Sequence, residues 1–290
     1  MKDTIVYILK KLLGINDLSL YVRKKKQQFE KIIYTQKYTS DDIIKILRES
    51  GVKPGRPLVV HSAMGSLYNY KGTAEELIDK IIEYLGPDGT LCMPAYPINK
   101  FDNTKVFDVL NTPSAAGYLT EVFRKRPGVK RSLNQLHSVC ALGKDADFIT
   151  REHHLSRTCF DEHSPYYLIG QLGGYSMSIG MPKWFVGTGE HVCESLLYGK
   201  LPFFTNKFNI EETFHYIDEA GEDFYHTMNA RSKTPKAYVR THSTLLFDKF
   251  FDSQKFSRRK LSNIWICCFD MRYLYEKLTE LAIKGINIYS

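Results

Sequence analysis

The segment GTGEHVCESLL, residues 187–197, places a histidine between two glutamates. Histidine titrates at about pH 6.5, so His191 can take a proton from an attacking amine at neutral pH. On a helix, positions three apart share a face, so Glu194 can hold the second ring nitrogen and stabilise the imidazolium. Glu190 points to another side, where it either binds a substrate amine or faces solvent. The pattern predicts a general base with an orienting acid.

Metal chemistry is poorly supported by the same residues. His191 and Glu194 supply at most two ligands, and His153 and His154 are adjacent, so their side chains diverge. No second histidine or cysteine pair has ligand spacing. The chain also lacks the G-x-S-x-G elbow of serine hydrolases and the Walker loop of kinases. We therefore expect no metal cofactor.

A second polar stretch lies at a predicted strand end. The run RPLVVHSA, residues 56–63, is short and rich in valine, which predicts a buried strand. This strand delivers two polar side chains to a loop that contains a glycine, and a helix follows. Main-chain N–H groups in such a loop can hold an anion or a developing oxyanion. The candidate ligands of this loop are His61, Ser62, Ala63, Met64 and Gly65.

Two other groups could complete such a site. The hydroxyls of Thr112 and Ser114 are alternative donors to an oxyanion. The stretch RKRPGVKR, residues 124–131, carries five cations and no acid, and Arg131 is its last residue. Cations of this kind bind phosphates, although a solvated basic turn has the same composition.

The elements that must position these residues alternate between strands and helices. Apolar runs bounded by glycine and proline predict the strands, and capped amphipathic stretches predict the helices. This alternation indicates an α/β domain with a largely covered sheet, whose ligands bind at strand ends. Strands are expected within 56–63, 89–96, 138–143 and 175–181, and helices within 39–51, 72–86, 112–126, 211–223 and 270–284.

The net charge of +8 is concentrated at the N-terminus, because residues 1–36 contribute +5 of it. We therefore divide the chain into a basic amphipathic arm, 1–36, and a domain, 37–290, and we expect no nucleic acid partner. The arm can lie on an anionic membrane surface, dock on a partner or pack on its own domain. Six scattered cysteines and the absence of an apolar run of membrane-spanning length favour a cytoplasmic protein. Membrane contact through the arm would place it at the inner membrane surface.

Taken together, the ordered motifs resemble the aminoglycoside 3-N-acetyltransferase family in its broad sense, including amino-sugar N-acyltransferase relatives. The resemblance rests on VVHSAMGSL, GTAEELIDKIIEYLGPDGTLCMPAY, NTPSAAGYLTEVF, HSPYYLIGQLGGYSMSIGM and GTGEHVCESLL, which span about residues 40–200. It implies an α/β/α sandwich of that family's type, here with a basic N-terminal helical arm. It also implies a coenzyme A thioester, acetyl-CoA or another acyl-CoA, as co-substrate, and His191 as general base. The chain departs from the family at Leu133-Asn134-Gln135, where His-Pro is common after Arg-Ser-x.

The acceptor is predicted less directly. An amino sugar linked to a nucleotide, used for surface polysaccharide, suits the basic loops and the basic arm. An aminoglycoside antibiotic is the alternative, and its positive charges would need acids such as the six within residues 211–223. Those acids also fit a solvated helix. A further alternative is a protein that binds acyl-CoA or a sugar without catalysis.

Overall fold

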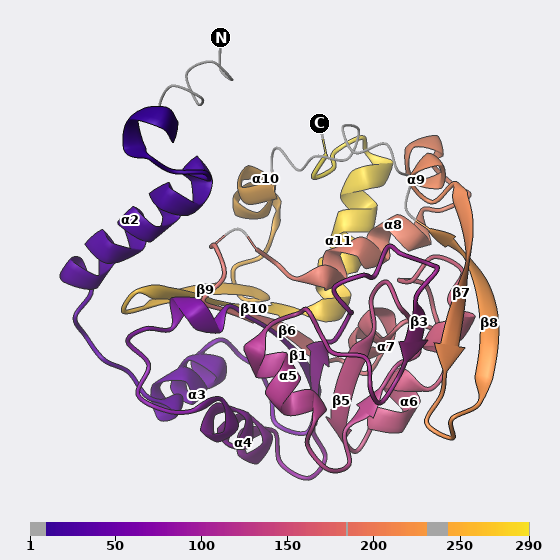
Figure 1. Cartoon of the computed structure of the whole chain (residues 1–290), viewed down its shortest axis with the longest axis horizontal. Coiled ribbons are helices and arrows are strands. Elements are labelled where there is room, and N and C mark those ends of the chain that lie inside the picture. Colours follow the sequence, from indigo (N-terminus) through magenta and orange to yellow (C-terminus); the bar gives the residue numbers. More distant parts are fainter. Residues whose placement is uncertain (1–9, 184, 231–242, 290) are drawn as a thin grey trace.

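The computed structural model describes residues 10–183, 185–230 and 243–289. Its centre is a seven-stranded mixed sheet in the order β4-β5-β2-β1-β6-β10-β9 (Figure 1). β1 (Pro57–Ser62) pairs in parallel with β2 (Thr90–Pro94) and with β6 (Tyr175–Ile179). The outer strands are antiparallel to their neighbours: β5 (Val139–Gly143), β4 (Lys130–Arg131), β10 (Ile264–Asp270) and β9 (Phe256–Leu261).

The sheet is covered on both faces, which explains why the first four residues of β1 are apolar. Leu58 and Val60 belong to one buried cluster and Val59 to the other, as the alternation of side chains along a strand requires. One cluster is completed by α3 (Ser40–Glu49), α4 (Ala74–Leu85) and α5 (Tyr118–Arg124). The other is completed by α6 (Ala146–Thr150), α7 (Pro165–Gln171), α8 (Val192–Leu196) and α11 (Met271–Ile283). The predicted α/β/α sandwich is confirmed.

A smaller sheet of three strands packs beside the second cluster. It contains β3 (Val106–Asp108), β7 (Ile210–Ile217) and β8 (Asp223–Ala230), and it lies at the right of Figure 1. The predicted helix over 211–223 is therefore wrong. Phe214 and Tyr216 are buried while the intervening His215 is only partly so, which is the period of a strand.

Helix boundaries follow local signals where capping groups exist. Thr39 caps α3 and forms a capping box with Asp42, and Gly86 ends α4 with a φ of 71°. The helix predicted from residue 112 begins six residues later, at Tyr118, with Gly117 as its N-cap. Residues 112–117 form an irregular loop because Ala115 donates to the carbonyl of Tyr96 and so leaves the helical pattern.

The remaining elements are short or lie outside the sandwich. The 3₁₀ turn η1 (Met64–Ser66) follows β1, η2 (His153–Leu155) follows α6, and η3 (Thr188–His191) leads into α8. Further along the chain, α9 (Pro202–Lys207) follows α8, and α10 (Ser243–Phe250) precedes β9. The N-terminal arm contains α2 (Leu18–Ile33). Within the described ranges, none of the helices is long and apolar enough to cross a bilayer.

Candidate active site

His191 and Glu194 meet as their spacing predicts. His191 is the last residue of η3 and Glu194 lies in the first turn of α8, so the two side chains share one face. The Nδ1 atom of His191 is 2.8 Å from Oε1 of Glu194. The imidazole is 13% exposed and the carboxylate 1%, so the ring alone reaches toward solvent. This arrangement leaves Nε2 as the nitrogen that can exchange a proton with a ligand.

The carboxylate of Glu194 also holds two groups that the sequence did not indicate. The ammonium of Lys207, at the end of α9, is 2.5 Å from Oε1 and is itself 1% exposed. The hydroxyl of Tyr289 donates to the same oxygen, and Lys207 donates to Tyr289. Burial raises the pKa of Glu194, but the charges of His191 and Lys207 outweigh burial and hold that pKa well below its usual range. Glu194 is therefore ionised at neutral pH.

Glu190 lies against the other side of the imidazole. Its side chain is 1% exposed, and its Oε1 is 3.9 Å from Nε2 of His191. The alternative in which this residue faces solvent is therefore wrong. A carboxylate beside the reactive nitrogen is placed to attract a cationic amine toward the base.

A small cavity opens beside the ring. Its volume is about 30 Å³, about one water molecule's share of liquid volume. Phe160 lies between two imidazoles in this wall, with ring centroids 5.2 Å from His191 and 4.5 Å from His137. Apart from His191 and Glu194, which we call the dyad, the wall is therefore mainly aromatic and apolar. The lining residues are Phe101, Leu136, His137, Cys159, Phe160, His191, Glu194 and Phe208.

His61 joins β1 to the turn that carries the base. Its Nε2 accepts the main-chain N–H of Thr188 at 3.1 Å, and the Oγ1 of Thr188 is 3.0 Å from the same nitrogen. Burial lowers the pKa of His61 to about 4, so the ring is neutral. Gly187 packs on this ring, because a Cβ there would lie 2.8 Å from Cε1 of His61. His61 thus supports η3, and its predicted contact with the co-substrate stays a prediction.

The rest of the loop after β1 borders a much larger cavity. This cavity has a volume of about 850 Å³ and lies at the carboxyl ends of β1 and β6. Ala63 and Gly65 line it, whereas Ser62 and Met64 are partly buried beside them. Ser66 and Tyr68, at and after η1, also line it. Its other walls come from α2, from the loop after β6 and from the β9–β10 hairpin: Glu30, Gly180, Met181, Pro182, Lys183, Lys260, Asn263, Ile264 and Trp265.

The loop 112–117 meets the end of β1. A Cβ on Gly117 would lie 3.6 Å from the carbonyl oxygen of Ser62. The hydroxyl of Thr112 accepts the N–H of Asp108 at 2.9 Å, and the hydroxyl of Ser114 accepts the N–H of Ala116 at 3.1 Å. Both hydroxyls are therefore fixed in place by main-chain donors.

Arg131 is a support of this loop in the structure. Its guanidinium donates to the carbonyls of Thr112, Ala95 and, at 3.3 Å, Val109. Burial lowers the pKa of Arg131 to about 10. These main-chain bonds give Arg131 a positioning role, and its predicted phosphate contact stays a prediction.

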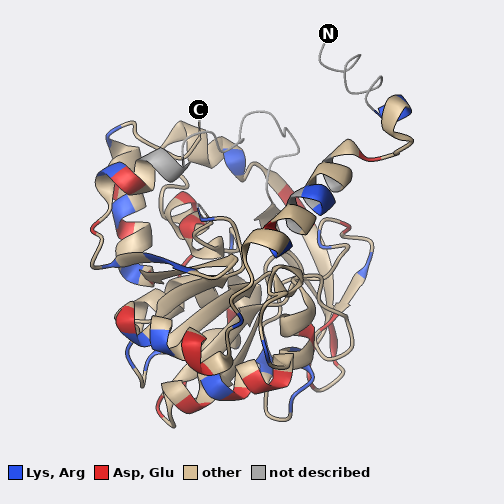
Figure 2. Cartoon of the chain, turned by 90° about the vertical axis from the view of Figure 1, so that its left-hand side faces the viewer, with Lys and Arg blue, Asp and Glu red and all other residues tan. Residues whose placement is uncertain are grey.

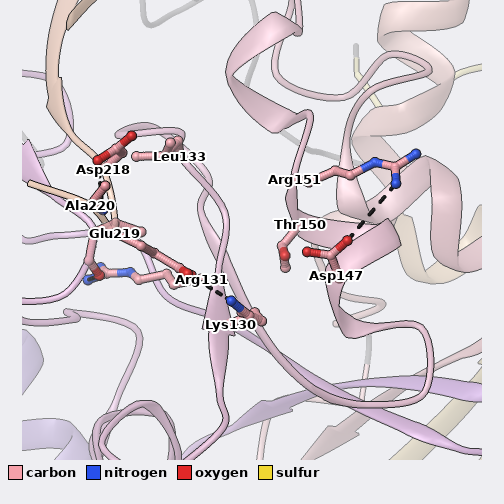
Figure 3. A pocket seen from close by; sticks show the side chains of 10 residues that line it. Lys130, Arg131, Leu133, Asp147, Thr150, Arg151, Asp218, Glu219 and Ala220 are labelled. Carbon is pink, nitrogen blue, oxygen red and sulfur yellow. Dashed lines mark hydrogen bonds and ion pairs between the residues drawn. The ribbon is translucent and has the colours of Figure 1, made fainter. Parts of the chain in front are cut away.

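Residues of the basic stretch 124–131 and of the acidic segment 211–223 meet at a third cavity, of about 280 Å³ (Figure 3). Lys130 pairs with Glu219 at 2.8 Å, and Arg151 approaches Asp147 at 4.0 Å on the opposite wall. The positive charge predicted for phosphates and the negative charge predicted for an acceptor therefore partly neutralise each other. Among the residues that the structure describes, no group of three or more His, Cys, Asp or Glu side chains could hold a metal ion.

Comparison with known proteins confirms the predicted family. A sequence model described as aminoglycoside 3-N-acetyltransferase matches residues 59–282, and the chain belongs to this family. An aminoglycoside N(3)-acetyltransferase III of Salmonella is 27% identical over 180 residues, which are 55% of this chain and 61% of the relative. A prophage-derived aminoglycoside N(3′)-acetyltransferase-like protein of Bacillus subtilis is 28% identical over 138 residues, 40% of this chain and 51% of the relative. The chain thus spans less than two thirds of these curated relatives.

Solved structures share the fold at low sequence identity. Aminoglycoside acetyltransferase AAC(3)-Xa superposes with a TM-score of 0.73 at 20% identity and covers 91% of this chain and 99% of that one. The enzyme AAC-IIIb, solved as a binary complex with CoASH, has a TM-score of 0.70 at 19% identity, covering 87% and 99%. These likenesses establish the architecture of the sandwich.

Proposed function

We propose that the chain is an acyl-CoA-dependent N-acetyltransferase that acts on an amine of an amino sugar. The observation that carries this proposal is the His191–Glu194 pair, whose imidazole is partly exposed at a small cavity, in a chain of this family. The large cavity lies at the carboxyl ends of β1 and β6, the edge at which ligands of open α/β sheets bind.

The large cavity at β1 and β6 suits coenzyme A. Its volume of about 850 Å³ is within the usual range of ligand pockets, and its walls carry two cations, Lys183 and Lys260, that can meet phosphates. The loop of Ala63 and Gly65 forms one wall and so approaches a bound ligand with its main chain. The solved relative AAC-IIIb is described with CoASH, which supports the same co-substrate here.

The side chains around His191 can carry out the proton transfer. When bound, the coenzyme supplies an acetyl thioester. Glu190 attracts the ammonium form of the acceptor, and Nε2 of His191 removes the proton that the amine must lose to attack. The imidazolium that results is stabilised through Nδ1–H by the carboxylate of Glu194. Glu194 stays in place because Lys207 and Tyr289 bind its oxygen.

The names of the curated relatives favour an aminoglycoside-like acceptor over a nucleotide-linked amino sugar. A polysaccharide role receives no support from these comparisons. The cavity of about 30 Å³ beside His191 is smaller than any sugar, so binding an acceptor requires its aromatic wall to open. Phe101, which is largely exposed at the rim, is the side chain best placed to move.

Release of free thiol from acetyl-CoA, measured with a panel of amines, tests the proposal. We expect turnover with kanamycin-like amines and a loss of at least about a hundredfold in His191→Ala. His163→Ala is the matched control, because His163 pairs with Glu152 away from the dyad, and it should retain the wild-type rate. Binding of coenzyme A without turnover of any amine would favour the non-catalytic alternative. A normal rate in His191→Ala would remove the base from the mechanism.

A further inference from the structure

The arm helix α2 turns an apolar stripe outward. Val22 is 56% exposed, Phe29 64% and Ile32 75%, although such side chains are normally buried. At about 100° per residue, Val22, Phe29 and Ile33 fall within roughly 40° of one another around the helix. Leu12 and Leu13, just before α2, are exposed as well. Exposed apolar side chains that share one face of a helix mark a site of interaction.

The polar side of α2 is the side that meets the domain. Glu30 lines the large cavity at β1 and β6, and the ammonium of Lys31 is 5.3 Å from the ring centroid of Tyr68. These two positions lie roughly 100° and 160° around the helix from Phe29. Figure 1 shows α2 standing beside the sandwich. The alternative in which the arm packs its apolar face on its own domain is therefore wrong.

The chemistry of α2 indicates what covers the stripe. Its sequence carries five cations and one acid, and that acid, Glu30, is turned toward the domain. Lys24 and Lys25 are exposed, and Figure 2 shows basic residues along the arm. A second copy of the helix would bring the same positive charge, which opposes a self-contact. An anionic lipid surface satisfies both the apolar stripe and the cations.

We propose that α2 binds in the plane of an anionic lipid surface, with Val22, Phe29 and Ile33 inserted and with Lys25, roughly 40° around the helix from Phe29, at the lipid phosphates. The helix lies on the surface, since no described helix of the chain can span a bilayer. This membrane contact uses residues other than those of the acetyl transfer proposed above. The stripe and Lys25 line neither the large cavity nor the small one, although Glu30 of the same helix lines the large cavity.

Flotation of the full-length chain with vesicles tests the membrane contact. We expect the chain to float with mixed phosphatidylglycerol and phosphatidylcholine vesicles at low salt, to float less at high salt, and to stay unbound with phosphatidylcholine alone. Phe29→Ser should weaken binding about tenfold or more. Lys25→Gln should weaken it about fivefold.

Two matched variants keep this test specific to α2. Ile283→Ser removes an exposed apolar side chain from α11, and Lys45→Gln removes an exposed lysine from α3. Both should bind vesicles like the wild type. Thermal melting checks that each variant folds, and Val22→Ser replaces Phe29→Ser if the latter does not.

Three outcomes would overturn the proposal. The first is an absence of flotation with anionic vesicles at low salt. The second is flotation that Phe29→Ser and Lys25→Gln leave unchanged, which would place the contact elsewhere. The third is a dimer in solution, measured by light scattering, that Phe29→Ser abolishes while vesicle binding is absent. That result would assign the stripe to self-association.

Discussion

The ammonium of Lys207 lies close enough to the imidazole of His191 to influence its protonation. It lies 2.5 Å from the oxygen of Glu194 that also holds Nδ1 of His191, and both charged side chains are 1% exposed. With Lys207 present, the charge of the carboxylate is already balanced. In Lys207→Met, the nearest balancing charge is a proton on the imidazole. We therefore predict that this variant raises the pKa of His191 and impairs the base at neutral pH.

The size of this effect follows from the distances. Nδ1 of His191 and Nζ of Lys207 contact one oxygen at 2.8 Å and 2.5 Å, so the two nitrogens are at most 5.3 Å apart. Two unit charges at roughly 5 Å interact by about 3 kcal/mol at an effective dielectric constant of about 20, which is about 2 pKa units. Glu190, 3.9 Å from Nε2, favours the protonated ring in both proteins and so cancels in the comparison. We expect a rise of about 1–2 units.

The pH dependence of kcat/KM measures this shift. In Lys207→Met the acid limb should move upward by about 1–2 units, with activity largely recovered near pH 9. Lys207→Arg keeps the charge and should leave the limb close to its wild-type position. Tyr289→Phe removes a hydroxyl from the same carboxylate without removing a charge, so it is the matched control. Lys207→Gln repeats the experiment if the methionine variant does not fold.

Two kinds of result would refute the prediction that Lys207 lowers the pKa of His191. If Lys207→Met lowers kcat/KM by the same factor at every pH, the lysine holds the fold together and does not tune the base. A limb that stays in place or moves downward would have the same consequence.

Four further predictions concern stability and the acceptor. Glu194→Gln should lose about 3 kcal/mol of unfolding free energy in urea, because it leaves a buried charge unbalanced. Since the folded pKa of Glu194 is depressed, that difference is complete above its unfolded value of 4.5 and shrinks as pH falls. Arg131→Met should cost about 2–4 kcal/mol in the same assay, since buried carbonyls lose their donor. Gly187→Ala should melt at lower temperature and turn over more slowly, since φ there is 88° and the new Cβ meets the ring of His61. Glu190→Gln should raise KM for the acceptor about tenfold with a smaller change in kcat, measured by thiol release.

Much of the fold could be predicted because its signals are local. The cap at Thr39, the stop at Gly86 and the apolar run of β1 each act within a few residues. The prediction failed where two local patterns competed. In residues 211–223 the frequent acids suggested a solvated helix, but the alternation of Phe214 and Tyr216 gives a strand that packs against the second core. Pairing with β8 decides that competition, and a single segment carries no record of its partner.

In the candidate site, too, the local contact could be predicted from the sequence and the long-range contacts could not. His191 and Glu194 are three residues apart, so helical geometry alone brings them together. Lys207 and Tyr289 reach the same carboxylate from 13 and 95 residues further along the chain. No spacing or motif in the sequence marks Lys207 as a buried residue. The packing of α9 and of the C-terminal residues beside α8 creates that role, so the electrostatics of the base could not be predicted from the sequence.

Charge along the sequence predicts binding only after ion pairing is known. The basic stretch 124–131 and the acids of 211–223 each resembled a ligand site, yet Lys130 and Glu219 pair with each other. In the same stretch Arg126 pairs with Asp79, so its charge is also balanced within the domain. On α2, by contrast, five cations stand against one acid, which leaves most of the charge without a compensating acid on the same helix. The arm therefore combines this positive charge with an exposed apolar stripe, which is the pairing that a lipid surface requires.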